Sequence, residues 1–253
     1  MIKQILNTIP RPWLIRMSYL FIPFSRLFYY GKRYECPVCK GTFRKFLPYG
    51  YGNLRANALC PGCLSLERHR LMWLYLQNKT QFFSQKQKVL HIAPEQSFLK
   101  RFRKMKNLDY STADLFSPLA DYRCDVQKLP FEKENFDLVI CNHVLEHVDN
   151  DQLAMSEILR VLKPGGYAIL QVPVNFSREH TFEDMSITDP RERARIFGQY
   201  DHVRVYGRDY PDLLRRAGFI IDEESYTHEL SDELKERYSV KVSEFMFACK
   251  KAL

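Results

Sequence analysis

The order of apolar and polar positions along the chain predicts a protein of alternating strands and helices. From residue 88 onward, short apolar runs typical of strands alternate with segments of helical spacing. We expect strands near residues 88–93, 109–113, 122–125, 136–141, 167–173, 219–226 and 243–250, and helices near 97–106, 151–162 and 208–217. This alternation is typical of a parallel sheet flanked by helices, the α/β class.

Glycine-containing segments are expected to end two of these helices. LKPGG at 162–166 follows one helix and precedes the strand YAILQVPV, and RRAGF at 215–219 follows another. A further helix is expected from Leu64, where LSLERHRLMWLYLQNK has apolar residues at helical spacing.

Residues 1–32 form an amphipathic segment. Its apolar tract is interrupted by Arg16, Pro23 and Arg26, whereas a membrane span needs about 20 mainly apolar residues, so neither a signal peptide nor a span is expected. Basic residues flank its aromatic side chains between residues 11 and 33. We expect the tract to pack on the protein's own domain or to make peripheral contact with a membrane surface.

Four cysteines lie in a second segment, residues 33–78. Cys36 and Cys39, then Cys60 and Cys63, form two C-x2-C pairs separated by twenty residues. This spacing predicts a tetrahedral zinc module with a linking helix, and two disulfides or four separate thiols are the alternatives. Four thiolates leave no position for water, so the predicted Zn²⁺ is structural.

The charge balance favours anionic partners. The 253 residues include 38 Lys and Arg against 30 Asp and Glu, a net charge of +8. Near the cysteines, basic and aromatic residues are interleaved, which predicts either an RNA-binding face or a seam between this module and the next domain. They are Arg44, Lys45, Arg55, Arg68, His69 and Arg70, with Phe43, Phe46, Tyr49 and Tyr51. Single cysteines inside apolar runs favour a reducing, cytoplasmic location.

Three motifs in sequence order carry a resemblance to a known family. DVQKLPF, FDLVICNHVLEHVDN and LRVLKPGGYAILQVPV make residues 88 to 250 resemble the class I S-adenosylmethionine-dependent methyltransferases of the type 11 kind. The resemblance implies an enzyme with a Rossmann-like, seven-stranded sheet over residues 79–253, its last strand antiparallel. It also implies that S-adenosyl-L-methionine binds at the carboxyl ends of the first four strands.

The same resemblance assigns cofactor contacts. Asp114 would bind the ribose hydroxyls with Leu115 covering the adenine, Asp125 and Val126 would lie by the adenine amino group, and Asn142 would meet the methionine half. The alternative for Asp125 is that it caps a turn. The seven residues 115–121 are too short for a crossover helix, so we expect none there.

The glycine-rich loop of the family is replaced in this chain. His91, Ala93, Glu95 and Ser97 stand at the positions of an acid and three glycines. A phosphate-bearing cofactor would be repelled by Glu95, whereas a sulfonium compound would be attracted. We expect HIAPE to be a rebuilt cofactor loop, in which Ala93 stays small and Glu95 replaces the acid missing at His91. The alternative is that Glu95 or Ser97 caps the next helix.

A long segment, about residues 174–207, is expected to be a substrate lid. A hydroxyl acceptor needs a base, for which His202 is the first candidate, then His180, with His143 evenly divided between catalysis and structure. Glu146 and His147 are expected to be structural. The predicted reaction is O-methylation of a small-molecule or saccharide-like acceptor. The alternatives are an RNA methyltransferase that uses the zinc module, or a non-enzymatic binding protein with a degenerate cofactor loop. The sequence does not indicate an oligomeric state.

Overall fold

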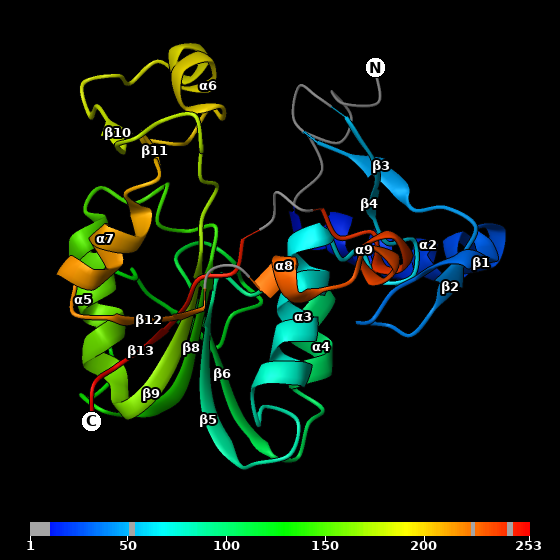
Figure 1. The fold of residues 1–253 in the computed structure, drawn as a ribbon, viewed down its shortest axis with the longest axis horizontal. Coiled ribbons are helices and arrows are strands. Elements are labelled where there is room, and N and C mark those ends of the chain that lie inside the picture. The colour runs from blue at the N-terminus through cyan, green and yellow to red at the C-terminus, as the bar shows by residue number, and fades with distance from the viewer. Residues whose placement is uncertain (1–10, 51–53, 224–225, 242–244) are drawn as a thin grey trace. The chain divides into compact units, whose positions relative to one another are not determined.

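The computed structural model describes all residues except 1–10, 51–53, 224–225 and 242–244. The chain divides into two compact units that are not continuous in sequence (Figure 1). Unit 1 comprises residues 1–81, 95–101 and 227–244. Unit 2 comprises residues 82–94, 102–226 and 245–253. None of the described helices is long and apolar enough to span a membrane.

Unit 1 contains two small antiparallel hairpins and several helices. β1 (Tyr30–Glu35) pairs with β2 (Thr42–Phe43), and β3 (Leu47–Tyr49) pairs with β4 (Arg55–Leu59). Its helices are α2 (Arg11–Phe28), α3 (Glu67–Lys79), α4 (Gln96–Phe102) up to Arg101, α8 (Tyr226–Glu229) from Thr227, and α9 (Asp232–Tyr238). The helix expected from Leu64 is therefore α3, which begins three residues later.

Arg70 is the buried centre of unit 1. Its guanidinium group donates hydrogen bonds to the carbonyl oxygens of Ala58 (3.0 Å), Ser65 (2.8 Å), Tyr238 (2.6 Å) and Ser239 (2.7 Å). A buried charge is tolerated only when its donors are satisfied, and four carbonyl dipoles meet that need. Arg70 therefore connects β4, the second cysteine pair and the end of α9 within this unit.

Unit 2 is built on a seven-stranded sheet of order β12-β13-β9-β8-β5-β6-β7 (Figure 1). The parallel strands are β5 (Gln87–Ile92), β6 (Leu108–Asp114), β7 (Tyr122–Arg123), β8 (Phe136–Asn142) and β9 (Leu162–Gln171). β13 (Ala248–Lys250) is antiparallel to both of its neighbours, β9 and β12 (Ile220–Glu223). The expected Rossmann-like sheet with an antiparallel last strand is confirmed.

Helices α5 (Asp151–Val161) and α7 (Tyr210–Arg216) also belong to unit 2. The segment after β9 contains β10 (Phe182–Glu183), α6 (Pro190–Phe197) and β11 (Arg204–Val205). α6 is a short helix begun by Asp189, whose carboxylate accepts hydrogen bonds from the backbone N–H groups of Arg191 and Glu192. The expected lid segment is therefore an ordered structure with its own elements.

The predicted boundaries are right in three places and wrong in two others. No helix lies within residues 115–121, as expected from their short length. Gly218 follows α7 with φ of 97°, as expected of a glycine at a helix end. α5 does end directly before LKPGG, but the strand expected from residue 167 already begins at Leu162, which pairs with Phe136 of β8. The helix expected over 97–106 ends at Phe102.

Two expected strands reach residues that are not described. The strand expected over 219–226 is described as β12 up to Glu223, and residues 224–225 lie outside the described part. Residues 242–244 also lie outside the described part, and the strand expected over 243–250 is described as β13 from Ala248.

Candidate functional site

The carboxyl ends of three neighbouring strands bring several predicted site residues to one edge of the sheet. Ile92 of β5 pairs with Ala113 of β6 and with Cys141 of β8. The residues that follow these three, namely Ala93, Asp114 and Asn142, therefore stand side by side at this edge. Open α/β sheets bind their ligands outside such an edge.

Ala93 adopts the backbone conformation that glycine normally provides. Its φ is 49°, in the left-handed region, and its N–H donates to the carbonyl oxygen of Ala113 at 2.8 Å. A side chain beyond Cβ would add to the cost of this conformation, which is roughly 1–2 kcal/mol for an ordinary residue. The turn that the family's glycines make is thus retained with the smallest side chain that has a Cβ.

Glu95 belongs to unit 1, where its Oε1 lies 3.6 Å from His69 Nε2. Its carbonyl oxygen accepts from Phe98 and Leu99, which begin α4. Ser97 is buried, with its hydroxyl 3.4 Å from His69 Nδ1. The part of Glu95 in a cofactor site stays a prediction.

Asp114 and Asp125 each organise a turn. Asp114 Oδ1 accepts from the backbone N–H groups of Phe116 (2.8 Å) and Ser117 (2.6 Å), and no described residue donates to its Oδ2. Asp125 Oδ1 accepts from the N–H of Gln127 at 2.8 Å. The capping role considered for Asp125 is therefore present, and a cofactor contact for either carboxylate stays a prediction.

The other predicted cofactor residues differ in exposure. Leu115, next to Asp114, is exposed, whereas Val126 is part of the hydrophobic core. His91 is fully buried, with its Nδ1 2.8 Å from the hydroxyl of Tyr110. Asn142 is also buried. Leu115 is thus the one of these four that is open to a ligand without rearrangement.

Three side chains from the loop directly after β8 and one from the lid segment form a cluster of histidines around a buried glutamate. His143 Nδ1 lies 3.2 Å from Glu146 Oε1, and the rings of His147 and His202 meet edge to face at 4.7 Å. Glu146 is 1% exposed and His202 8%. The structure therefore brings together two of the three predicted bases, His143 and His202, and joins to them the two residues expected to be structural.

Burial and charge set the protonation of this cluster. Burial alone raises the pKa of the Glu146 carboxyl group, but the hydrogen bond from His143 and the proximity of His147 outweigh it and lower that pKa. Burial lowers the pKa of His202 in spite of the nearby carboxylates of Glu146 and Asp201. The cluster thus combines an ionised carboxylate with a neutral imidazole at pH 7.

The lid segment is fastened to the loop after β8 by residues that the sequence did not single out. Arg204, 1% exposed, donates to the carbonyl oxygens of Leu145 and Val148 (2.6 Å each) and of Asp149 (3.1 Å). Two further bonds stabilise the junction: Val203 N donates to Glu146 O at 3.0 Å, and the Tyr206 hydroxyl donates to Asp151 Oδ2 at 2.8 Å. These bonds hold His202 against Glu146. An arginine between two valines in VRVYG was the available signal.

His180, the second predicted base, is not part of this cluster. Its side chain is 78% exposed, and its Nδ1 lies 3.8 Å from Asp209 Oδ2. Its predicted role has no support from the burial or geometry that distinguish His143 and His202.

Comparison with known proteins agrees with this architecture. Residues 75–170, which contain the strands β5 to β9 up to Leu170, match the family model described as a methyltransferase domain. These residues are thus similar to a methyltransferase domain. Two solved structures share the fold of the chain with a TM-score of 0.50 each. One is 1,6-didemethyltoxoflavin-N1-methyltransferase of Burkholderia thailandensis, with S-adenosylhomocysteine bound (14% identity, 74% of this chain and 79% of that chain). The other is the [4+2]-cyclase SpnF (17% identity, 73% and 81%).

Curated relatives match a smaller share of the chain than these two structures do. Demethylmenaquinone methyltransferase of Lactococcus lactis is 30% identical over 108 residues, which cover 38% of this chain and 43% of that protein. A probable tRNA methyltransferase 9B of Homo sapiens is 35% identical over 74 residues, 28% and 16% respectively. The chain thus spans less than half the length of the curated relatives it matches.

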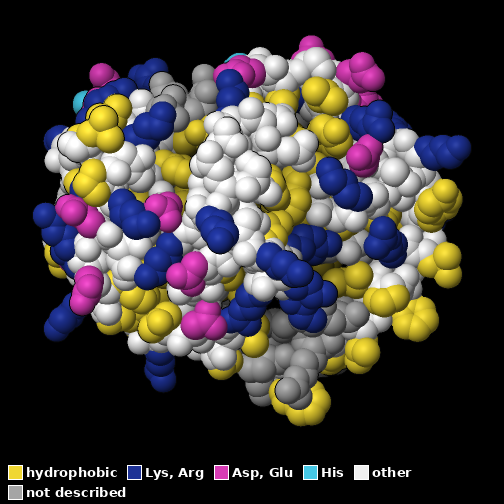
Figure 2. All heavy atoms as spheres, turned by 90° about the horizontal axis from the view of Figure 1, so that it is seen from below, with side chains coloured by type: hydrophobic (Ala, Val, Ile, Leu, Met, Phe, Trp, Pro, Cys, Tyr) yellow, Lys and Arg dark blue, Asp and Glu magenta, His cyan; other side chains and the backbone are white. Residues whose placement is uncertain are grey.

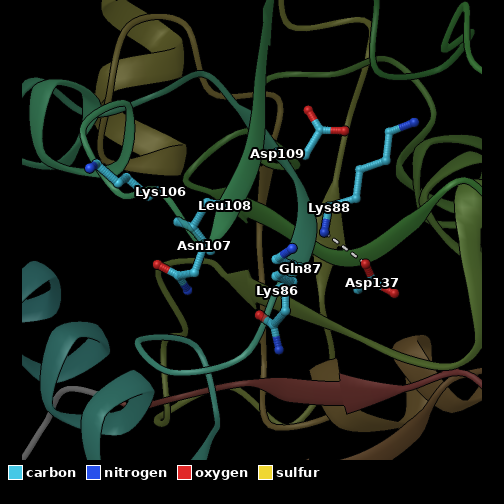
Figure 3. A pocket seen from close by; sticks show the side chains of 8 residues that line it. All are labelled: Lys86, Gln87, Lys88, Lys106, Asn107, Leu108, Asp109 and Asp137. Carbon is cyan, nitrogen blue, oxygen red and sulfur yellow. Dashed lines mark hydrogen bonds between the residues drawn. The ribbon is translucent and has the colours of Figure 1, made fainter.

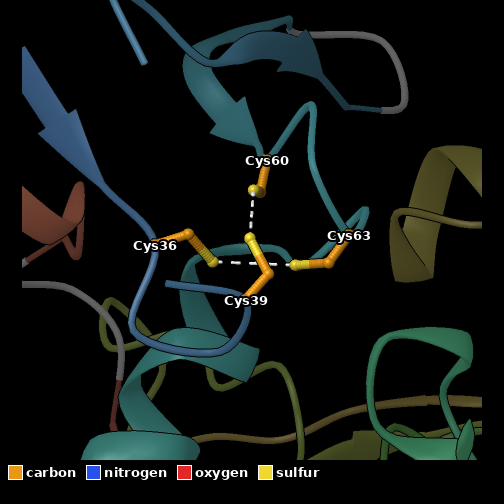
Figure 4. Close-up of side chains that lie close together, drawn as sticks. All are labelled: Cys36, Cys39, Cys60 and Cys63. Carbon is orange, nitrogen blue, oxygen red and sulfur yellow. Dashed lines mark hydrogen bonds between the residues drawn. The ribbon is translucent and has the colours of Figure 1, made fainter. Parts of the chain in front are cut away.

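Outside the methyltransferase domain's sheet, the four predicted zinc ligands of unit 1 converge (Figure 4). All four Sγ atoms lie within 4.8 Å of one another, with Cys36 3.6 Å from Cys63 and Cys39 3.8 Å from Cys60. These distances are too long for disulfides, and they are close to the edge of a tetrahedron of thiolates at about 2.3 Å from a central zinc ion. Burial raises the pKa of Cys36, but hydrogen bonds from the other three thiols and the charge of Arg70 lower it well below its usual value.

The predicted basic and aromatic face around these cysteines is mostly internal. Phe43, Phe46, His69 and Arg70 are buried, and Arg55 pairs with Glu67 at 3.1 Å. Arg44 and Lys45 are exposed, and Tyr49 is 38% exposed. Tyr51 lies outside the described residues. These buried side chains and the Arg55 pair belong to unit 1 itself, and the expected seam with the next domain stays a prediction.

A polar hollow of about 410 Å³ lies at the opposite end of the parallel strands (Figure 3). It is formed where β5, β6 and β8 begin and is lined by Lys86, Gln87, Lys88, Lys106, Asn107, Leu108, Asp109 and Asp137. On the face seen from below in Figure 2, Lys and Arg side chains gather near the middle. Asp137 accepts hydrogen bonds from the backbone of Lys88 and from Lys163 Nζ, both at 2.7 Å, so it already has partners. This hollow is not at the carboxyl edge where such sheets bind ligands.

Proposed function

We propose that the chain is an S-adenosylmethionine-dependent methyltransferase that methylates a hydroxyl oxygen of a small-molecule or saccharide-like acceptor. The observation that carries the proposal is the pair of His143 and the buried, ionised Glu146, which follows the fourth strand of the methyltransferase domain. A carboxylate that orients an imidazole is the usual arrangement of a general base. A hydroxyl acceptor must lose its proton as the new bond to the methyl group forms, and a base in this position would accept that proton.

The cofactor is proposed to bind at the carboxyl edge of β5, β6 and β8. The left-handed turn at Ala93 lets the chain pass close to a ligand, and Asp114 Oδ2 is available for ribose hydroxyls. Leu115 lies next to it and is 44% exposed, as a side chain that covers an adenine ring must be. The proposed contacts within unit 2 are His91, Ala93, Asp114, Leu115, Asp125, Val126 and Asn142, and the contact of Glu95 stays a prediction from the sequence.

In the proposed reaction, the acceptor oxygen attacks the methyl carbon while the bond from that carbon to the sulfonium sulfur breaks. The hydroxyl proton passes to Nε2 of His143, whose Nδ1 faces Glu146. The charge of Glu146 stabilises the imidazolium that forms. Holding acceptor and methyl group in line can contribute about 7–11 kcal/mol, so the fastened lid segment is expected to matter as much as the base.

Calorimetry with S-adenosylmethionine and S-adenosylhomocysteine tests the cofactor proposal. We expect binding of both by the native chain, and a loss of at least about tenfold in affinity in Asp114→Asn, which removes a charge-assisted hydrogen bond. Asp109→Asn, at the other end of β6, is the matched control. If neither compound binds the native chain, the non-enzymatic alternative is favoured.

Methyl incorporation from labelled S-adenosylmethionine into a metabolite extract tests the reaction. We expect His143→Gln to lower the turnover of the labelled acceptor about 10²–10⁴-fold while cofactor affinity is kept. Retained turnover would exclude His143 and direct attention to His202.

The cysteine cluster is proposed to hold a structural Zn²⁺. Four buried or half-buried thiols at tetrahedral spacing next to the guanidinium of Arg70 are suited to a doubly charged ion, which all four thiolates would bind. A closed site of this kind contributes to folding and takes no part in methyl transfer.

RNA methylation remains as a second candidate because of one hollow in unit 1. It has a volume of about 410 Å³, and its lining includes Arg33, Arg44 and Lys45 together with Tyr29 and Phe46. Lys45 Nζ lies 5.8 Å from the centre of the Tyr29 ring. Salt-sensitive binding of RNA that is lost in Arg44→Ala would favour this candidate. The control is Arg55→Ala, because Arg55 is paired with Glu67, and this variant should keep the binding.

Helix α2 is proposed to make peripheral contact with an anionic membrane surface. One stripe of this helix is more than half exposed, namely Trp13, Met17, Leu20, Phe21, Phe24, Leu27 and Phe28. Basic residues at 26, 32 and 33 supply the charge that anionic headgroups attract. Flotation with phosphatidylglycerol vesicles should be lost in the double variant Phe24→Ser, Leu27→Ser and kept in Leu234→Ser. Equal flotation of the two variants would exclude the proposal.

A further inference from the structure

Three side chains of unit 2 form a set of metal-ligating groups that lies apart from the cysteines. Glu146, His147 and His202 each offer a ligand atom, and these atoms lie within 4.8 Å of one another. Two imidazoles and one carboxylate are a donor set that proteins use for catalytic zinc, with a coordination position left for water or substrate. His147 is about 30% exposed, so the cluster is open to solvent on its side.

A buried atom in this cluster is short of a partner. Glu146 Oε1 faces His143, whereas Oε2 is buried and accepts no hydrogen bond from any described residue. Leaving a buried carboxylate oxygen without a donor or cation costs free energy. A bound cation would supply the missing interaction, and the two neighbouring imidazoles would complete its coordination.

Each of the three ligand side chains also makes a second contact that fixes its orientation. His147 Nδ1 lies 3.3 Å from the carbonyl oxygen of Asp201, which leaves Nε2 for a metal. The ring of His202 makes a hydrogen bond with the backbone of Phe197, and Glu146 Oε1 is held by His143. Histidines that bind metals usually give their other nitrogen to a carbonyl or carboxylate group, and this outer contact fixes the ring.

We propose that Glu146, His147 and His202 bind one divalent transition-metal ion, with His143, Asp201 and the backbone of Phe197 orienting the ligands. Three protein ligands leave at least one position for an oxygen of another molecule. That this position receives the acceptor hydroxyl rests on the proposed methyl transfer, whereas the metal site itself does not.

The test uses Co²⁺ as the probe on the full chain with zinc in its cysteine site. After weakly held metal is removed with a chelator, Co²⁺ is titrated and its visible spectrum recorded. We expect uptake of one further equivalent, with weak ligand-field bands and without the strong near-ultraviolet charge-transfer bands of thiolate ligands. Absence of saturable uptake, or thiolate bands for the added ion, would overturn the proposal.

Variants of the ligands separate this site from adventitious binding. Glu146→Gln and His202→Gln are each expected to weaken Co²⁺ binding by at least about 100-fold, since a lost ligand should cost no less than a lost outer partner. Because both residues are buried, His147→Gln is the variant expected to fold in any case, and it should show the same loss. His228→Gln, an exposed histidine of unit 1, is the matched control.

An affinity in His147→Gln equal to that of the native chain would refute the site, as would an equal loss in His228→Gln. Calorimetry with S-adenosylmethionine on the same samples keeps the two proposals apart. A chain that takes up Co²⁺ as expected and does not bind S-adenosylmethionine would retain the metal site and lose the proposed function. The reverse result would retain the methyltransferase proposal without a metal.

Discussion

The two clusters of metal-ligating side chains in this protein differ in how they are assembled. In unit 1, four thiols from two short C-x2-C pairs converge within 4.8 Å, and three of the four are buried. In unit 2, the ligand atoms of a carboxylate and two imidazoles also lie within 4.8 Å of one another, yet His202 comes from the far end of the lid segment. A set of four thiolates closes the coordination sphere, whereas a set of three mixed donors leaves it open. The difference separates a cluster that can only stabilise from one that can also take part in chemistry.

The two clusters also lie in different structural surroundings. Unit 2 has a large apolar core under its seven-stranded sheet. Unit 1 has two small hairpins, and its centre is the charged side chain of Arg70. The two short hairpins next to the cysteines have little core of their own, so their stability depends on a metal or on buried polar bonds. We therefore expect unit 1 to be the more sensitive of the two to loss of its metal ligands.

The largest effect is expected for the double variant Cys36→Ser, Cys60→Ser. Removing one ligand from each pair should abolish zinc binding, whose free energy in small metal-dependent folds is about 10–16 kcal/mol. Hydrogen-exchange mass spectrometry should show loss of amide protection in β1 to β4, with protection in β5 and β8 retained. Cys124→Ser, a cysteine outside the cluster, is the control. Retained zinc or retained protection in the double variant would contradict the comparison.

Arg70→Met should have the next largest effect. It removes four hydrogen bonds to carbonyl oxygens of unit 1, and breaking a buried charged network of this kind costs roughly 3–5 kcal/mol. Denaturant unfolding of the zinc-loaded chain measures the loss. Arg68→Met, at a partly exposed neighbouring position, should change the free energy of unfolding much less. Equal losses in the two variants would show that the hydrogen bonds of Arg70 are not what stabilises unit 1.

Tyr206→Phe tests how the second cluster is held. The variant removes the hydroxyl group that donates to Asp151 Oδ2 at 2.8 Å and also lies 3.2 Å from the carbonyl oxygen of Leu145, which should cost about 1–3 kcal/mol of unfolding free energy. Because Tyr206 anchors the segment that carries His202, Co²⁺ affinity should fall as well. Tyr200→Phe, whose side chain is 53% exposed, is the control. A loss of stability without a change in Co²⁺ affinity would mean that the lid anchor does not position the cluster.

The smallest effect concerns pH. The hydrogen bond from Arg160 lowers the pKa of the Glu157 carboxyl group, against burial and with help from the backbone N–H of Leu129. A lowered folded-state pKa contributes stability above the unfolded pKa of about 4.3, and that contribution is lost as pH falls through the folded value. Glu157→Gln should therefore be about 1 kcal/mol less stable than the native chain at pH 7, and the difference should shrink below about pH 4.

Glu192→Gln is the matched control for this pH effect, since Glu192 pairs with Arg195 at the same spacing on an exposed surface. Exposed pairs of this kind contribute little, so its stability should follow the native curve. Parallel curves for Glu157→Gln and the native chain across the whole range would exclude the assignment.

Several features could be predicted because their signal is local. The strands β5, β6 and β8 follow from apolar runs, and the missing crossover helix follows from the seven residues between Asp114 and β7. The position of Ala93 in a left-handed turn agrees with its alignment to a glycine of the family. The start of β9 was misplaced, because Leu162 already pairs with Phe136 across the sheet, whereas α5 ends at Val161, directly before LKPGG.

The roles of Arg70, Arg204 and Glu146 could not be predicted in the same way. For Arg70 the sequence left open a nucleic-acid face or a seam with the next domain, and its charge is buried among carbonyl groups that come from both ends of the chain. Arg204 and Glu146 owe their partners to the return of the lid segment to the loop after β8. A sequence gives the chemical type of such residues and not the groups that surround them.

By itself the sequence determined the α/β class, the order of the main strands along the chain and the grouping of four cysteines into two C-x2-C motifs. Each of these is recognised from the spacing of residues within a short stretch of sequence. Only the tertiary structure decided which histidines meet, since His202 comes from the end of the lid segment and is far in sequence from His143, Glu146 and His147. It also decided which charges are buried, because the free energy of a charge depends on the dipoles and solvent around it and not on its neighbours in the chain.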